Sequence, residues 1–164
     1  MSRKRRAYEA GHKPKYLVII DESPECDRAV YYASRRASRT GSGMLMLLVI
    51  EPHDRHQQWL GVADIMREEA EENANAALDR AATRAKRIVG ITPERVICEG
   101  DATEQILKVI EQDLDIIMLV LAANPGAEGP GPLIAAIAKT VGSFPVPVVI
   151  VPGDLGDADI DALS

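Results

Sequence analysis

The sequence predicts an α/β fold in which helices cover both faces of a five-stranded parallel sheet. Short apolar runs alternate with runs of helical periodicity along the 164 residues, a pattern that indicates β-α-β units. Several of the apolar runs show no polar alternation, which is typical of strands buried on both faces. Because crossovers between parallel strands are right-handed, we expect an open sheet with the strand order 3-2-1-4-5.

The five expected strands are apolar, and the last one carries a signal for its position in the sheet. They lie at residues 16–20, 44–50, 95–98, 115–121 and 146–151. Pro147 has no backbone N–H to give to a neighbouring strand. The last strand is therefore expected at an edge.

The first expected helix follows the first strand directly. Ser23 is the expected N-terminal cap, and Pro24 lies just inside the helix, where its missing N–H costs nothing. Gly41 is expected to end this helix.

Three more helices follow from the spacing of apolar residues. Alanines at helical spacing predict a long helix over about 61–89, with acids early and bases late, as the helix dipole favours. Asp101 and Glu104 predict a capping-box variant at the start of the third helix. A fourth helix is expected over about 132–142, beginning at Pro132.

The charge distribution divides the chain into three parts. The net charge is −6, but residues 1–15 carry six basic residues against one acid, so the remainder is −11. We expect a basic, disordered tail over 1–14, a single domain over 15–152, and an acidic tail over 153–164 that either docks weakly or frays. An acidic body argues against nucleic acid binding on the folded domain, although the basic tail can contact nucleic acid or an acidic partner.

The sequence also predicts where the protein resides. It shows no secretory signal segment and no apolar run near the roughly 20 residues that a membrane span needs. We therefore expect a cytoplasmic protein without membrane contact, in which Cys26 and Cys98 stay reduced. Cys26 falls in the first turn of a helix, where a thiolate is favoured, but we interpret it as an idle thiol.

Candidates for metal binding and catalysis are weak. His53, Asp54 and His56 share one loop, but their spacing matches no ligand pattern. No Ser-His-Asp or Cys-His order stands out. We predict no metal and no catalytic residue.

Two polar segments mark a candidate ligand site. The first strand ends in Asp21-Glu22-Ser23, and open α/β sheets bind ligands at the carboxyl ends of their strands. A Gly/Pro-rich loop over 122–133 follows the fourth strand and contains Gly126, Gly129 and Gly131. We expect any ligand to lie between Asp21, Val49 at the end of the second strand, and this loop.

The chain resembles the universal stress proteins over residues 15–152. The resemblance rests on the Asp21-Glu22-Ser23 turn, the Leu48–Glu51 end of strand two, the Glu99–Ala102 turn, and Pro145-Val146-Pro147 before the last strand. It implies a Rossmann-like open sandwich of the adenine nucleotide alpha hydrolase-like type. Many members of that family bind ATP or AMP, and members dimerise through the last strand, here Val146 to Pro152.

The resemblance also implies site residues. Asp21 and Val49 take the positions that contact the nucleoside, and Ser23 belongs to the same turn. The family's phosphate loop has the pattern Gly-x2-Gly-x9-Gly-Ser/Thr, which presents N–H groups to the anion. Gly126 and Gly129 match its beginning, but the position ten residues further on is Lys139.

The chemistry of the loop is also poor for phosphate. Pro125, Pro130 and Pro132 remove three N–H donors, and Glu128 adds a negative charge. In favour of binding, Gly129, Gly131 and the N–H groups after Pro132 can still form a small anion nest.

Two functional hypotheses follow. The first is a regulatory protein of the universal stress type that acts as a homodimer and binds an unknown protein partner, with nucleotide binding weak or lost and no cofactor expected. The alternative is a protein that binds ATP or AMP, or slowly hydrolyses it, through a variant Gly-Pro loop.

Overall fold

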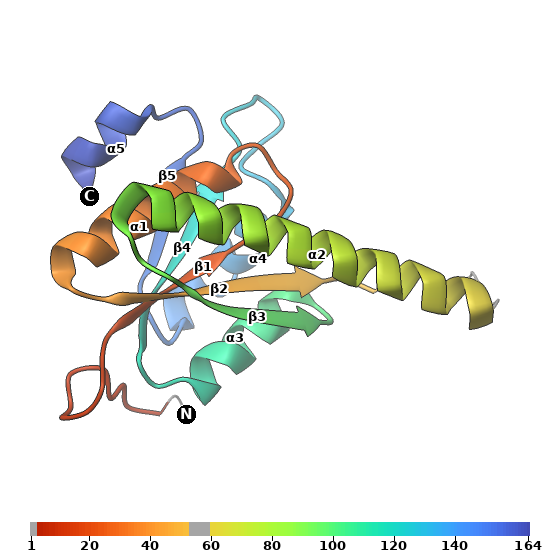
Figure 1. The fold of residues 1–164 in the computed structure, drawn as a ribbon, viewed down its shortest axis with the longest axis horizontal. Coiled ribbons are helices and arrows are strands. Elements are labelled where there is room, and N and C mark those ends of the chain that lie inside the picture. The colour runs from red at the N-terminus through yellow and green to blue at the C-terminus, as the bar shows by residue number, and fades with distance from the viewer. Residues whose placement is uncertain (1–2, 53–59) are drawn as a thin grey trace.

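A computed structural model describes residues 3–52 and 60–164 and shows a five-stranded parallel sheet with helices on both faces (Figure 1). The strands are β1 (Lys15–Ile19), β2 (Gly43–Ile50), β3 (Glu94–Glu99), β4 (Ile116–Ala123) and β5 (Val148–Pro152). The helices are α1 (Cys26–Thr40), α2 (Leu60–Val89), α3 (Ala102–Gln112), α4 (Pro132–Ala138) and α5 (Asp157–Leu163), with a 3-10 turn η1 (Val141–Ser143). The sheet order β3-β2-β1-β4-β5 confirms the predicted order, with β5 at an edge.

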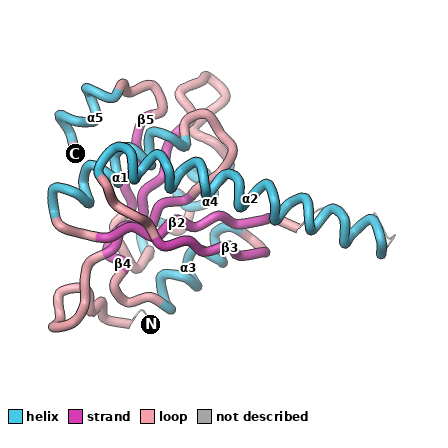
Figure 2. The backbone as a smooth tube through the Cα atoms, in the orientation of Figure 1, coloured by secondary structure: helices cyan, strands magenta, loops and turns pink. Residues whose placement is uncertain are grey.

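The side chains of β1 and β2 alternate between two hydrophobic cores, one on each face of the sheet. Val18, Met46 and their neighbours pack with α1, α2 and α5, whereas Leu17, Leu47 and their neighbours pack with α3 and α4. Figure 2 shows the central strands between these two helical layers. Both faces of β1, β2 and β4 are largely buried, which explains the unbroken apolar runs of these strands.

The strand order places a ligand crevice beside β1. β1 pairs in parallel with β2 on one side and with β4 on the other. After β1 the chain passes to α1 on one face of the sheet, and after β4 it passes to α4 on the opposite face. A crevice forms at the carboxyl ends where the connections diverge. The β1–α1 and β4–α4 connections therefore meet at one edge.

The start of α1 differs from the prediction. The helix begins at Cys26, its cap residue is Glu25, and no side chain caps it, so Ser23 is not the cap. The reason is local: the Ser23 backbone N–H and hydroxyl both donate to Asp21 Oδ1, so the polar atoms of Ser23 close a turn instead.

The remaining helix ends follow the predictions in two of three places. Gly41 ends α1 with a φ of +69°, and Asp101 caps α3 by accepting the Glu104 N–H at 3.0 Å. The fourth helix is shorter than expected, because α4 ends at Ala138 and the 3-10 turn η1 follows.

The N-terminal segment is packed against the body. We expected a disordered tail over 1–14, but Ala7 is 1% exposed and the Arg6 N–H donates to the Leu114 carbonyl at 2.9 Å. The Arg5 guanidinium donates to the carbonyls of Ile110 at 2.7 Å and Asp113 at 3.1 Å. These carbonyls belong to the end of α3, where helix carbonyls lack partners within the helix.

The C-terminal segment docks rather than frays. Ile160 of α5 is fully buried in the core beneath α1. The Tyr31 hydroxyl donates to Asp161 at 2.9 Å, and Arg28 donates to Asp157 at 2.8 Å. One buried apolar residue and this polar cluster fix α5 to α1.

Candidate functional site

A cavity of about 320 Å³ lies at the carboxyl edge of the sheet, between the β1–α1 turn and the segment that enters α4. The end of β4 closes it from below through Leu121 and Ala122. The residues contributed by the two connections are Asp21, Ser23, Glu25, Cys26, Pro130, Gly131, Pro132, Leu133 and Ile134. The structure therefore brings together Asp21, Ser23 and Gly131 from the predicted set.

Asp21 is held in a fixed orientation by its own turn. Its Oδ1 accepts the Ser23 backbone N–H at 2.8 Å and the Ser23 hydroxyl. Its other oxygen makes no hydrogen bond within the described part of the chain. Asp21 thus presents one oriented acceptor, which suits a donor such as a hydroxyl or an amine.

The described lining of this cavity carries negative charge. Among residues 3–52 and 60–164, Asp21 and Glu25 line it, whereas no lysine or arginine of these ranges does. Phosphate sites in proteins depend on N–H donors and positive charge. The two carboxylates oppose the entry of a phosphate group.

The glycines of the 122–133 loop do not present their N–H groups together to the cavity. Gly131 lines the cavity with a φ of +108°. The Gly126 N–H donates to Asn124 Oδ1 at 2.7 Å, and the Gly129 N–H donates to the Gly126 carbonyl at 3.4 Å. Two of the three predicted N–H donors are therefore occupied within the loop, and Gly126 and Gly129 lie outside the cavity lining.

Val49 also lies outside the cavity lining. Its side chain packs against the core beneath α3 and α4, and its partner in the adjacent strand is Cys98 of β3. The nucleoside contact that the resemblance implies for this residue stays a prediction.

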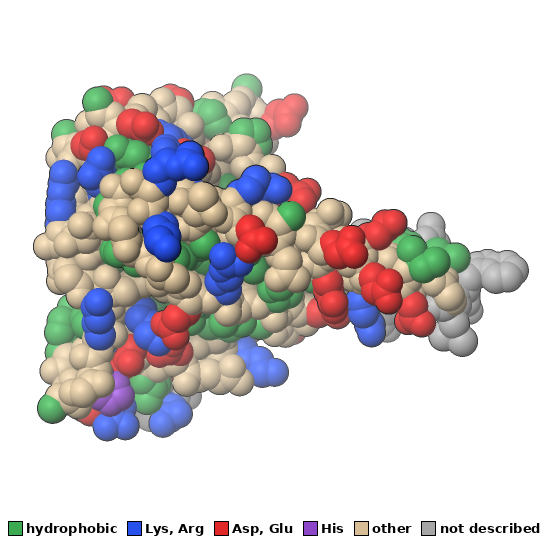
Figure 3. Space-filling model, in the orientation of Figure 1, with side chains coloured by type: hydrophobic (Ala, Val, Ile, Leu, Met, Phe, Trp, Pro, Cys, Tyr) green, Lys and Arg blue, Asp and Glu red, His purple; other side chains and the backbone are tan. Residues whose placement is uncertain are grey.

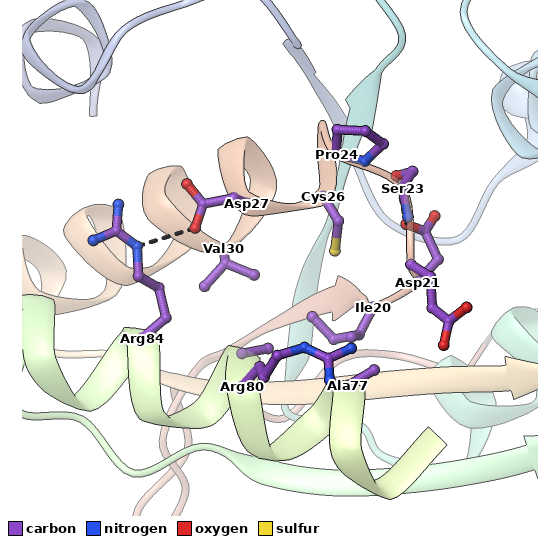
Figure 4. A pocket seen from close by; sticks show the side chains of 12 residues that line it. Ile20, Asp21, Ser23, Pro24, Cys26, Asp27, Val30, Ala77, Arg80 and Arg84 are labelled. Carbon is purple, nitrogen blue, oxygen red and sulfur yellow. Dashed lines mark hydrogen bonds and ion pairs between the residues drawn. The ribbon is translucent and has the colours of Figure 1, made fainter. Parts of the chain in front are cut away.

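A second cavity, of about 310 Å³, lies on the other face of the sheet between the β1–α1 turn and α2. Figure 4 shows Ile20, Val30 of α1 and Ala77 of α2 around it, with Arg80 and Arg84 extending from α2 and Arg84 reaching Asp27 of α1. Asp21, Ser23 and Cys26 line this cavity as well as the first one. The β1–α1 turn is therefore the wall between the two.

Two titratable groups of α1 border the second cavity. Burial raises the pKa of the Cys26 thiol to about 12, and its Sγ donates to the Ile19 carbonyl at 3.7 Å. The thiol is thus protonated at neutral pH, which agrees with an idle cysteine. Burial raises the pKa of Asp27, but the hydrogen bonds from Arg28 and Arg84 outweigh it and leave the pKa below its usual value.

Sequence reasoning missed several lining residues. Glu25 of the first cavity and Arg80 and Arg84 of the second were not assigned to a site. Helical spacing identifies the face of α2 that points inward, but it gives no sign that the β1–α1 turn lies opposite.

Neither a metal centre nor a membrane span is found in the described ranges. Residues 3–52 and 60–164 contain no group of three His, Cys, Asp or Glu that could hold a metal ion. His53, Asp54 and His56 lie outside the described residues. None of the helices described here has both the length and the apolar character to cross a membrane.

Comparison with known proteins assigns the chain to a family. The sequence model of the universal stress protein family matches residues 14–152, so the chain belongs to this family. No curated protein matches the sequence.

Solved structures share the fold at low sequence identity. The universal stress protein UspA from Lactobacillus plantarum is 19% identical, with a TM-score of 0.72 over 84% of this chain and 97% of that one. A universal stress protein solved in complex with cAMP is 18% identical, with a TM-score of 0.63 over 86% of this chain and 98% of that one. The Archaeoglobus fulgidus protein solved in complex with dAMP is 15% identical, with a TM-score of 0.60 over 84% and 96%.

Proposed function

We propose that this protein is a regulatory member of its family that forms a homodimer and acts by binding a protein partner, with nucleotide binding weak or lost. The observation that carries the proposal is the lining of the 320 Å³ cavity, to which the described residues contribute the carboxylates of Asp21 and Glu25 and no lysine or arginine. A neutral nucleoside can donate to Asp21, but the phosphates of a nucleotide would meet the carboxylates of Asp21 and Glu25. The fold retains a crevice in which phosphate binding is disfavoured.

The second candidate is a nucleotide-binding protein. Two relatives were solved with cAMP and with dAMP, which supports an adenine nucleotide as the ligand of this chain. The left-handed backbone of Gly131 and the N–H groups after Pro132 also leave room for a small anion nest.

Calorimetric titration with adenosine, AMP and ATP separates the two candidates. We expect adenosine to bind weakly, at about millimolar dissociation constants, and each added phosphate to weaken binding further. Asp21→Ala should reduce adenosine binding, whereas Asp154→Ala, an exposed acid outside the cavity lining, should not. ATP binding tighter than adenosine, or adenine nucleotide released when the purified protein is denatured, favours the second candidate and sinks the first.

The proposed homodimer uses the edge strand β5. Val148 and Val149 are half-buried and Ile150 is exposed, so an apolar strand edge faces outward. Such an edge invites pairing with another chain, and a two-fold contact satisfies both copies at once. Burial of these side chains would contribute about 1.5–3 kcal/mol for each one fully covered.

Val149→Lys tests this contact, because it places a charge in the apolar interface. We expect light scattering at micromolar concentration to show a shift toward a smaller assembly. The proposal fails if the unmodified protein is monomeric under these conditions.

A further inference from the structure

The helix α2 extends well beyond the sheet that it covers. Its 30 residues span about 45 Å, whereas the strands have at most eight residues, about 27 Å. From Gly61 to Asn73 every side chain is exposed or half-buried, and Ala74 is the first buried residue. Figure 1 shows this part projecting from the body.

One side of α2 faces solvent along the whole helix. Its residues follow one another at steps of three or four, which places them on a single helix face. They are Val62, Ile65, Met66, Glu69, Glu72, Asn73, Ala76, Arg80, Thr83, Arg84 and Arg87. All are exposed except Met66 and Arg84, which are half-buried. We call this set the outer face of α2.

The outer face begins with an apolar patch. Val62 is 44% exposed and Ile65 is 57% exposed, with Met66 beside them. An isolated helix as short as the projecting half of α2 is marginal in water. Most helical stability in proteins comes from packing an apolar face. The projecting half of α2 has such a face without a partner in the described chain.

The charge of α2 reverses along its length. Residues 61–73 carry five acids against one base, whereas residues 79–87 carry four bases against one acid. Figure 3 shows acidic side chains gathered on the projecting half and basic side chains nearer the body. Within the described residues, Glu69, Glu72, Arg80 and Arg87 form no ion pairs.

We infer that the outer face of α2 binds the outer face of α2 in a second copy of this chain, with the two helices antiparallel. A two-fold axis between Ala74 and Asn75 sets Glu69 of each copy opposite Arg80 of the other. The same axis sets Ile65 opposite Arg84. The acidic half of each helix then lies on the basic half of its partner.

A second copy fits this face better than another kind of occupant. A basic segment of a different protein would match the acidic half but repel the row from Arg80 to Arg87. An acidic segment would match the basic half of α2 but would be repelled by its acidic half. The antiparallel copy matches both halves at once, as a two-fold contact requires.

The contact also covers the apolar patch. Arginine side chains bury their apolar stems while the charged end stays in water. Arg84 is held by Asp27 at 3.0 Å, so its stem offers an ordered surface for Ile65 of the other copy. This contact is separate from the β5 edge and does not depend on it.

Charge-swap variants test the contact in the full-length Val149→Lys chain, in which the β5 contact is disrupted. We expect sedimentation equilibrium to show dimers at tens of micromolar. Glu69→Arg and Arg80→Glu should each raise the dissociation constant about tenfold or more, because like charges then face each other. The combined variant should restore dimers. Lys108→Glu on α3, an exposed charge on the other side of the sheet, is the matched control and should change nothing.

Several outcomes would overturn the inference. They are a monomeric Val149→Lys protein with native thermal unfolding, single variants that associate like their parent, or a combined variant that stays monomeric. The β5 contact is tested by light scattering in chains with an unmodified α2. A failure of the proposed β5 contact therefore does not change the outcome of the α2 charge-swap experiment. If Val149→Lys does not fold, the same α2 variants are compared in the otherwise native chain, where a decrease in assembly size supports the contact and an unchanged size refutes it.

Discussion

At the scale of single residues, the close approach of backbone segments explains why one position is occupied by glycine. Gly153 follows β5 and lies where a side chain would collide with its surroundings. A Cβ at this position would meet the Ala123 carbonyl oxygen, and would come within 2.9 Å of Glu25 Cβ and Pro125 Cδ. The absence of a side chain lets β5, the β4–α4 loop and the start of α1 converge beside the cavity.

Gly153→Ala should therefore destabilise the protein. Inserting a methyl group against fixed backbone costs about 1–3 kcal/mol of unfolding free energy, which urea denaturation can measure. Gly142→Ala is the control, because a Cβ there meets nothing within 4 Å. Equal stability of the two variants would contradict this account of the packing.

Asp27 makes folding stability depend on acid pH. Its pKa in the folded protein lies below its usual value, so its contribution is present above about pH 4 and is lost as the pH falls through the folded pKa. Asp27→Asn should reduce unfolding free energy at pH 6, and the deficit relative to the parent should shrink toward pH 3. Thermal unfolding across this range checks it, and a deficit that is constant with pH would exclude the ionic origin.

At the scale of elements, the N-terminal segment and the C-terminal helix stabilise the helices that they contact. The N-terminal segment closes the end of α3, and α5 lies on α1 through Ile160 and the arginine–aspartate cluster. Arg28, Arg35 and Arg84 also lie 5.3–5.5 Å from the centre of the Tyr31 ring, which favours cation–π attraction.

Arg5→Ala tests the N-terminal contact. The variant leaves the carbonyls of Ile110 and Asp113 without this charged donor, and hydrogen bonds to charged groups contribute about 1.5–3 kcal/mol. We expect a loss of this size in unfolding free energy by urea denaturation. Arg3→Ala, which removes an exposed charge two residues earlier, should have almost no effect.

At the scale of the whole molecule, the fold was predictable and the site only partly so. Strand order and helix positions follow from apolar runs and helical spacing, which are local properties. The packing of Arg5 was not predictable, because its acceptors are backbone carbonyls more than 100 residues away. A run of basic residues looks the same in sequence whether it is solvated or docked.

The candidate site was likewise predictable only in the features that are local in the sequence. Asp21 and Gly131 were found because strand ends and Gly-rich loops are visible in sequence. The loss of Gly126 and Gly129 as donors depends on hydrogen bonds within the loop, and the second cavity depends on how α2 crosses the β1–α1 turn. These are matters of three-dimensional placement.

The β1–α1 turn carries a consequence for communication across the sheet. Asp21, Ser23 and Cys26 line a cavity on each side, so the turn is a shared wall between two compartments. A molecule that shifts the turn when it enters one compartment reshapes the other. Thermodynamic reciprocity then requires that occupancy of the second compartment change affinity in the first by the same factor.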